Sequence, residues 1–362
     1  MGKDKYYMKM CLKLAKKGEG RVSPNPLVGA IVVKDGRIIG KGYHEKFGSP
    51  HAEARAIADA GKKGNSPHGS TLYVSLEPCS HTKKKTPPCV PLIIKKGIRR
   101  VVIGAKDSNP KVKGISVLKS AGIRVKCGVL KKEAERLNEI YNKFMKTGKA
   151  FVLLKMSQTK NGKIGIKGKA NVRISGKQFD AAVQSIRNKY DAILVGINTV
   201  LADDPRLTCR VKGGKNPVRI IMDSQLRTPI NAKILQNARH EPVIFASSSK
   251  CSRKKEQALK KKGAAVLISG KRKASLISLV KMLPSLGIYS LLIEGGKKIA
   301  KTALEQKLVD KLCLSINDKR IAEKGAVASP VTVAVLKKLK RKEKKKMGKD
   351  TVIEGYFTLY SK

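Results

Sequence analysis

The chain has 362 residues, a length that predicts about two domains at roughly 150 residues each. Hydrophobic residues make up 41% of the chain, enough for packed cores, so wholesale disorder is excluded. No apolar run of about 18 residues occurs, so neither a transmembrane helix nor a membrane partner is expected. Lysine and arginine number 79 against 26 aspartates and glutamates, and the resulting charge of +53 favours anionic partners.

The positive charge alone does not predict a specific nucleic-acid partner. Basic residues occur in every segment, whereas aromatic residues make up only 4% and tryptophan is absent. Surfaces for single-stranded nucleic acids usually combine basic with aromatic side chains. We therefore expect an anionic small molecule as the partner. The N-terminus has no apolar signal core, and seven scattered cysteines do not form a secreted disulfide pattern, which predicts a cytoplasmic protein.

Helices and strands alternate over the first 147 residues, which predicts an α/β layer. Apolar residues at helical spacing predict a helix over 6–17, and Asp35-Gly36 between two apolar runs predicts a β-hairpin. The other expected helices are 51–60, 91–96, 116–121 and 131–146. The expected strands are 27–33, 37–41, 71–76, 100–105 and 123–129.

The pattern restarts after Gly148-Lys149, which predicts one domain over 1–147 and a second over 148–362. The basic run at 337–349 is expected to be a solvated loop or helix. Strands of the second domain are expected at 151–156, 192–196, 218–223, 243–246, 264–268, 290–293, 310–316 and 351–360. Its helices are expected at 177–189, 252–262, 275–283 and 297–307.

A zinc site is predicted from three residues of the first domain, His51, Cys79 and Cys89. One imidazole and two thiolates leave the fourth tetrahedral position for water, whose pKa zinc lowers toward neutrality. Glu53, two residues after His51, can move a proton from that water to a leaving amine, as in zinc-dependent deaminases. Taken singly, the cysteines would be buried thiols and His51 a helix cap, but the ordered set favours the metal. The insert 80–88 must then loop out and return.

In the second domain, Gly295-Gly296 connects an expected strand to an expected helix. Such a turn brings backbone N–H groups to a phosphate at the helix N-terminus, although a Gly-Gly pair alone is as often a simple tight turn. With Glu294 before it, the pair predicts a dinucleotide site. Arg187 and Arg210 could bind a substrate phosphate bidentately, or lie on the surface, as most arginines of so basic a chain would.

Segments from both halves carry a family resemblance: 23–29, 42–44, 51–53, 73–81, 86–89, 191–196, 199–205, 217–224, 293–296 and 308–310. Together they resemble the bifunctional deaminase/reductase family of riboflavin biosynthesis. The resemblance implies a cytidine-deaminase-like three-layer domain followed by a dihydrofolate-reductase-like domain. It implies zinc-dependent deamination of 2,5-diamino-6-ribosylamino-4(3H)-pyrimidinone 5′-phosphate, then NADPH-dependent reduction of its ribosyl group to ribityl.

The resemblance also implies roles for individual residues. Cofactor contacts are expected at Ser157, Arg173, Thr199, Asp203, Ser224, Gly295 and Gly296. Substrate contacts are expected at Asn25, His44, Asn171, Arg187, Leu207, Arg210 and Glu294. Two positions depart from the family pattern, with Asn161 in place of aspartate and Arg173 in place of tryptophan. We expect Arg173 to compensate by contacting the cofactor, and reduction to proceed slowly.

Alternatives to this interpretation remain from the residues themselves. A nucleic-acid deaminase with an accessory domain is favoured by the charge and disfavoured by the long cysteine spacing. A deaminase whose second half is an inactive scaffold, or a basic binding protein on a retired enzyme scaffold, are the others. The sequence leaves the oligomeric state open, a homo-oligomer being one option.

Overall fold

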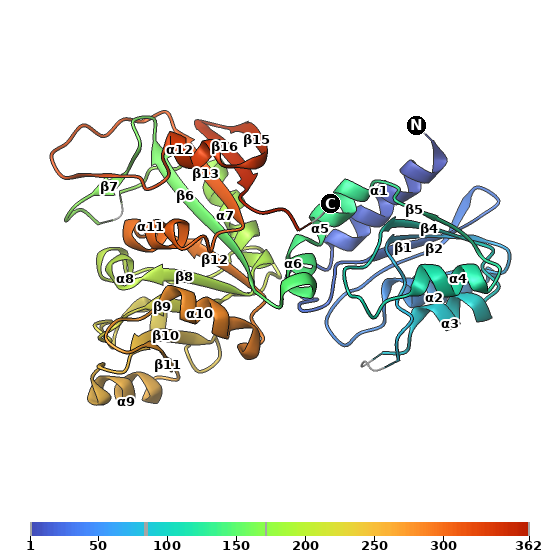
Figure 1. Cartoon of the computed structure of the whole chain (residues 1–362), viewed down its shortest axis with the longest axis horizontal. Helices are drawn as coiled ribbons and strands as arrows, with labels where there is room; N and C mark the ends of the chain where they lie inside the picture. The colour runs from blue at the N-terminus through green and yellow to red at the C-terminus, as the bar shows by residue number, and fades with distance from the viewer. Residues whose placement is uncertain (1, 83–85, 171, 361–362) are drawn as a thin grey trace. The chain divides into compact units, whose positions relative to one another are not determined.

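The computed structural model describes residues 2–82, 86–170 and 172–360 (Figure 1). They divide into two compact units. One contains the described residues up to Gly148 together with Tyr360, and the other spans Lys149–Leu359. Within the described ranges, no helix has the length and apolar character needed to cross a membrane.

The described part of the first unit forms a five-stranded sheet in the order β2-β1-β3-β4-β5. Strand β1 runs antiparallel to β2 and β3, whereas β3, β4 and β5 are parallel. Asp35 and Gly36 both have positive φ, as the tight turn of the predicted hairpin requires. The strands are β1 (Gly29–Lys34), β2 (Arg37–Tyr43), β3 (Thr71–Leu76), β4 (Arg100–Ala105) and β5 (Arg124–Cys127).

Helices cover both faces of this sheet and make three layers (Figure 1). Along β1, Ala30 and Val32 face one helix layer, and Ile31 and Val33 face the other, because successive strand residues point to opposite faces. One layer contains α1 (Lys3–Lys16), α5 (Lys131–Leu137) and α6 (Glu139–Thr147). The other contains α2 (Ala52–Lys62), α3 (Cys89–Lys95) and α4 (Gly114–Ser120).

The prediction of one continuous helix over 131–146 is wrong, because Asn138 separates α5 from α6. The Asn138 side chain is buried. Its Oδ1 accepts the backbone N–H of Leu27 at 2.8 Å and its Nδ2 donates to the carbonyl of Leu27 at 3.0 Å. Such a pair of bonds uses the asparagine as a fixed bridge to a distant loop, which local periodicity cannot reveal.

The second unit is built on a nine-stranded sheet in the order β11-β10-β9-β8-β12-β6-β13-β16-β15. Its first seven strands are parallel, and β16 and β15 are antiparallel additions at one edge. The strands are β6 (Phe151–Thr159), β8 (Ala192–Gly196), β9 (Val218–Met222), β10 (Val243–Ser248), β11 (Ala265–Gly270), β12 (Ser290–Glu294), β13 (Lys311–Asn317), β15 (Lys340–Met347) and β16 (Asp350–Tyr356). A small pair, β7 (Lys163–Ile166) and β14 (Ala326–Ala328), lies apart from this sheet.

The central parallel strands are almost entirely apolar, because helices cover both of their faces. The helices are α7 (Lys177–Lys189), α8 (Ile197–Asp203), α9 (Arg253–Lys261), α10 (Leu276–Met282), α11 (Lys297–Glu305) and α12 (Val333–Lys337). Short 3₁₀ turns occur at Lys233–Leu235 and Leu283–Leu286. The carboxyl ends of β8, β9 and β12 meet at one edge, which is where open α/β sheets bind ligands.

The basic run is an edge strand, which corrects the prediction of a loop or helix at 337–349. Residues 340–347 form β15 and pair with β16 through the backbone. Nearly all of their side chains are exposed, so no alternation of apolar and polar residues marks the strand in the sequence. Lysines on an edge strand also oppose pairing with another chain. The other predicted strands and helices occur, with ends shifted by a few residues.

Candidate functional sites

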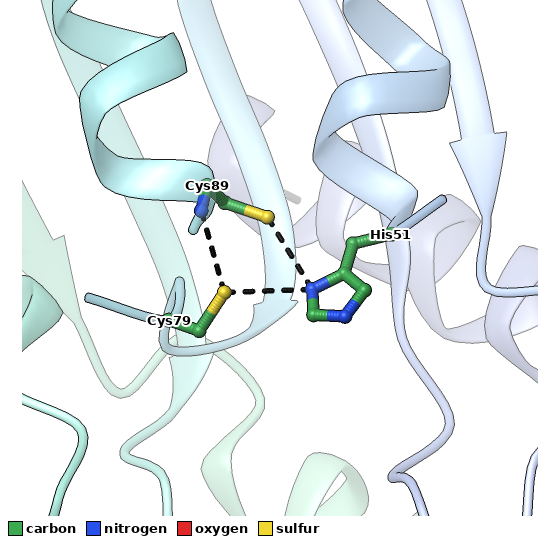
Figure 2. Close-up of side chains that lie close together, drawn as sticks. All are labelled: His51, Cys79 and Cys89. Carbon is green, nitrogen blue, oxygen red and sulfur yellow. Dashed lines mark hydrogen bonds between the residues drawn. The ribbon is translucent and has the colours of Figure 1, made fainter. Parts of the chain in front are cut away.

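His51, Cys79 and Cys89 come together in the first unit (Figure 2). His51 lies at the N-terminus of α2, Cys79 follows β3, and Cys89 is the first residue of α3. The Nδ1 atom of His51 is 3.4 Å from the sulfur of Cys79 and 3.4 Å from that of Cys89. Their three ligand atoms all lie within 4.8 Å of one another.

The geometry of this triad fits a tetrahedral zinc ion. Ideal Zn–S and Zn–N bonds at tetrahedral angles place nitrogen and sulfur about 3.6 Å apart, close to the 3.4 Å separations here. A single Nδ1 has either one proton or one lone pair, so it cannot make a good hydrogen bond to two sulfurs at once. A cation between the three atoms satisfies all of them.

The loop that carries Cys79 is held by the buried carboxylate of Glu77. The two oxygens of Glu77 accept the backbone N–H groups of Ile115 at 2.9 Å and Asp107 at 3.2 Å. Gly114 touches the same loop closely, since a Cβ at this position would lie 1.9 Å from the carbonyl oxygen of Pro78. Sequence reasoning missed Glu77 and Asp107, although Glu77 stands two residues before a predicted ligand.

Asp107 is a second buried carboxyl group near this loop. Burial raises the pKa of Asp107 to about 6, and the negative charge of Glu77 adds to this rise. Its Oδ1 accepts the Tyr141 hydroxyl at 2.8 Å and the backbone N–H of Asn109 at 2.7 Å. Both bonds favour the ionised form and limit the rise.

Glu53 lies in the first turn of α2, two residues from His51, and only 3% of it is exposed. Burial, together with the nearby Cys79, raises the pKa of Glu53 above its ordinary value. Asn25 and His44 lie next to the triad: the Nδ2 of Asn25 is 3.1 Å from the Nε2 of His44. The His44 and His51 rings are 5.3 Å apart between centroids.

In the second unit, a cavity of about 780 Å³ lies at the carboxyl ends of β8 and β9 and the N-terminus of α11. Three of the expected cofactor residues line it: Thr199, Ser224 and Gly296. Gly295 and Gly296 have φ of 98° and 79°, a conformation that favours glycine. The tight turn exposes the first N–H groups of α11, as a phosphate site requires.

Orphaned polar atoms also mark the second unit as able to hold a polar cofactor. The Oδ1 of Asp223, which lines the cavity, is buried without a hydrogen-bond partner among the described residues. The same holds for the hydroxyl of Ser157 on β6, an expected cofactor contact. Ser224 stabilises the cavity wall, because its Oγ accepts the backbone N–H of Ala274 at 3.0 Å.

A second cavity of about 720 Å³ contains most of the expected substrate residues. Arg187, Leu207 and Arg210 line it, as do Asp203 and Arg173, which were expected at the cofactor. The guanidinium of Arg173 is half-exposed and pairs with Asp180 at 2.6 Å. Asn171 lies outside the described residues.

Glu294 and Arg187 form a buried ion pair between β12 and α7. The Nε and Nη2 of Arg187 each donate to one carboxylate oxygen of Glu294 at 2.9 Å, and its Nη1 donates to the carbonyl of Thr208 at 3.0 Å. Burial alone would raise the pKa of Glu294, but Arg187 and the positive charge of Lys155 hold it below its ordinary value. Bidentate phosphate binding by Arg187 is therefore disfavoured. Arg206, which sequence reasoning missed, lines this cavity beside Arg210.

Replacing Arg187 with methionine is expected to lower the free energy of unfolding of the second unit by about 3–5 kcal/mol, because Glu294 then stays buried without its partner. In the unaltered chain, the stability from Glu294 is present above its unfolded pKa and is lost as pH falls through its lowered folded pKa. In the variant, burial raises that pKa instead, so the deficit is largest at neutral pH and shrinks on acidification.

Urea unfolding of the full chain at neutral and mildly acidic pH measures this effect. Arg210→Met is the matched control, since Arg210 lines the same cavity but is exposed. Equal stability of the two variants at neutral pH would contradict the prediction.

Comparison with known proteins covers both units. Residues 1–105 match the zinc-binding region of cytidine and deoxycytidylate deaminases, and residues 150–353 match the RibD C-terminal domain. A riboflavin biosynthesis protein RibD from Aquifex aeolicus is 41% identical, with 97% of each chain covered. The chain belongs to the RibD family.

Solved structures of RibD relatives agree with this assignment. A diaminohydroxyphosphoribosylaminopyrimidine deaminase/5-amino-6-(5-phosphoribosylamino)uracil reductase from Thermotoga maritima is 37% identical, with a TM-score of 0.85 and 98% of each chain covered. Acinetobacter baumannii RibD is 31% identical with a TM-score of 0.84, covering 98% of this chain and 99% of that one. The expected fold class, a cytidine-deaminase-like domain followed by a dihydrofolate-reductase-like domain, is confirmed. So is the expectation of an enzyme with a deaminase and a reductase half.

Proposed function

We propose that the chain carries out two successive reactions of riboflavin biosynthesis. The first unit hydrolyses the amine of 2,5-diamino-6-ribosylamino-4(3H)-pyrimidinone 5′-phosphate. The second unit then uses NADPH to reduce the ribosyl group of the product to ribityl. The observation that carries this proposal is the metal-ligating triad with buried Glu53 beside it, in a chain whose other unit holds a cavity suited to a dinucleotide.

In the deaminase reaction, His51, Cys79 and Cys89 hold zinc, which supplies hydroxide at neutral pH. Glu53 accepts the proton of the attacking water and returns it to the departing ammonia. A raised pKa suits both halves of this transfer, because the carboxyl group must gain the proton as well as lose it. Asn25 and His44, which lie next to the triad, supply hydrogen-bonding groups for the pyrimidine.

In the reductase reaction, NADPH supplies the hydride. The backbone at Gly295-Gly296 holds its pyrophosphate, and Thr199 and Ser224 line the same cavity. Arg206 and Arg210 in the neighbouring cavity bind the 5′-phosphate of the substrate. Arg187 and Glu294 position each other at the wall of that second cavity.

A preference for NADPH over NADH is supported by the charge around the first cavity. Arg227, Arg272 and Lys273 line it and are exposed, so they can meet the phosphate on the adenosine ribose. The loop that carries Arg272 and Lys273 is held to Ser224 through Ala274.

Changing both Arg272 and Lys273 to alanine is expected to raise the KM for NADPH about tenfold or more and leave the KM for NADH unchanged. A charge-assisted hydrogen bond is worth about 1.5–3 kcal/mol, and 1.4 kcal/mol corresponds to a factor of ten. Steady-state kinetics with both cofactors measures this, with Arg253→Ala on α9 as an exposed control outside the cavity. An equal rise for both cofactors would contradict the assignment of these residues to that phosphate.

The experiment that tests the whole proposal is incubation of the chain with the diaminopyrimidine phosphate, with and without NADPH. Mass analysis should show exchange of an amino group for oxygen without NADPH, and the further gain of two hydrogens with it. Ammonia released from tRNA or single-stranded DNA instead would favour a nucleic-acid deaminase. Deamination with no NADPH consumed would favour an inactive second unit.

The proposed setting is the cytoplasm, with a small-molecule substrate and no specific nucleic-acid partner. An odd number of scattered cysteines supports a reducing compartment. The even spread of lysine and the scarcity of aromatic residues support a small anionic substrate over a nucleic acid. A homo-oligomer is compatible with this proposal, and mass measurement in solution tests it.

A further inference from the structure

The segment between the two cysteines brings a hydroxyl group to the far side of the His51 ring. The Oγ1 of Thr86 is 3.0 Å from the Nε2 of His51. Figure 2 shows both sulfurs on the other side of the ring, facing Nδ1. We infer that Thr86 is a positioning residue for the metal ligand: its oxygen accepts the Nε2–H of His51 and holds the imidazole with the lone pair of Nδ1 toward Cys79 and Cys89.

The physical reason is the tautomerism of histidine. A neutral imidazole has one proton, which can be on either nitrogen. If the proton is on Nδ1, the nitrogen that faces the two sulfurs has no lone pair for a metal. A hydrogen bond from Nε2–H to a fixed acceptor selects the useful tautomer and also prevents rotation of the ring. Removing such a partner typically weakens metal binding 10–100-fold.

The backbone between Thr86 and Cys89 holds this hydroxyl in place. Pro87 and Pro88 occupy both intervening positions, and proline fixes the φ angle of the chain. At the end of the segment, the backbone N–H of Cys89 lies 3.1 Å from the carbonyl oxygen of Cys79 and 3.3 Å from its sulfur. The long spacing between the cysteines therefore gives the site a second metal ligand and an acceptor for the first, from one rigid segment.

This inference rests on the proposed zinc role of His51 and is tested separately from it. Thr86→Val removes the acceptor and keeps the shape, Thr86→Ser keeps the acceptor, and Thr82→Val changes an exposed threonine of the same insert. The apparent zinc Kd of each full-length variant is measured by chelator competition. We expect Thr86→Val to raise the Kd about 10–100-fold, and Thr86→Ser and Thr82→Val to stay near the unaltered chain.

A second readout reports the tautomer directly. In the zinc-loaded, ¹⁵N-histidine-labelled chain, the Nε2 of His51 should appear protonated, and its resonance should shift in Thr86→Val but not in Thr82→Val. An unchanged Kd in Thr86→Val, or a weakened Kd that Thr86→Ser does not restore, would overturn the inference. If His51→Ala binds zinc as tightly as the unaltered chain, the proposed zinc site itself fails instead.

Discussion

Replacing Glu53 with glutamine is expected to lower the rate of deamination about 10²–10⁴-fold while zinc stays bound. Glutamine has nearly the same shape as glutamate but cannot accept a proton from the attacking water. Glu53 is not one of the three clustered ligands, so its loss should leave the metal in place. Ammonia release and zinc content, measured on the same preparation, separate the two effects.

The matched control for this variant is Glu133→Gln, which changes an exposed glutamate in the first turn of α5. It should release ammonia at the normal rate. Near-normal ammonia release by Glu53→Gln would mean that another group moves the proton. Loss of zinc along with the activity would instead assign Glu53 a structural part in the metal site.

Replacing Cys89 with serine is expected to remove most of the zinc and to abolish deamination. A serine hydroxyl does not ionise at neutral pH and is a poor zinc ligand, so only His51 and Cys79 would remain. Reduction of the deaminated substrate should continue, because the predicted cofactor and substrate residues for that step lie in the other unit. Metal analysis, ammonia release and NADPH oxidation measure the three quantities.

Cys127→Ser provides the comparison, since Cys127 is an exposed cysteine of the same unit. It should keep its zinc and both activities. Undiminished zinc in Cys89→Ser would show that the metal ligands have been misassigned. Simultaneous loss of reduction would show that the two units depend on each other.

Local signals in the sequence were sufficient for several features of the molecule. The turn at Asp35-Gly36, the helix that begins after His51 and the strand-to-helix turn at Gly295-Gly296 all occur as predicted. Each depends on residues next to one another in the chain, whose φ angles, caps and spacing are set by their own chemistry. The metal triad was also predictable, because its ligands stand at the ends of predicted elements in a known order.

The tertiary structure alone decided the features that join distant residues. Arg187 pairs with Glu294, 107 positions away, instead of remaining free for a bidentate phosphate contact. Asn138 ends a helix because it binds the backbone of Leu27, and residues 340–347 form a strand because β16 provides their hydrogen bonds. Thr86 reaches the far nitrogen of His51 only once α2 and the insert have packed together. In each case the partner lies far away in the sequence, so no local pattern of charge or hydropathy records the contact.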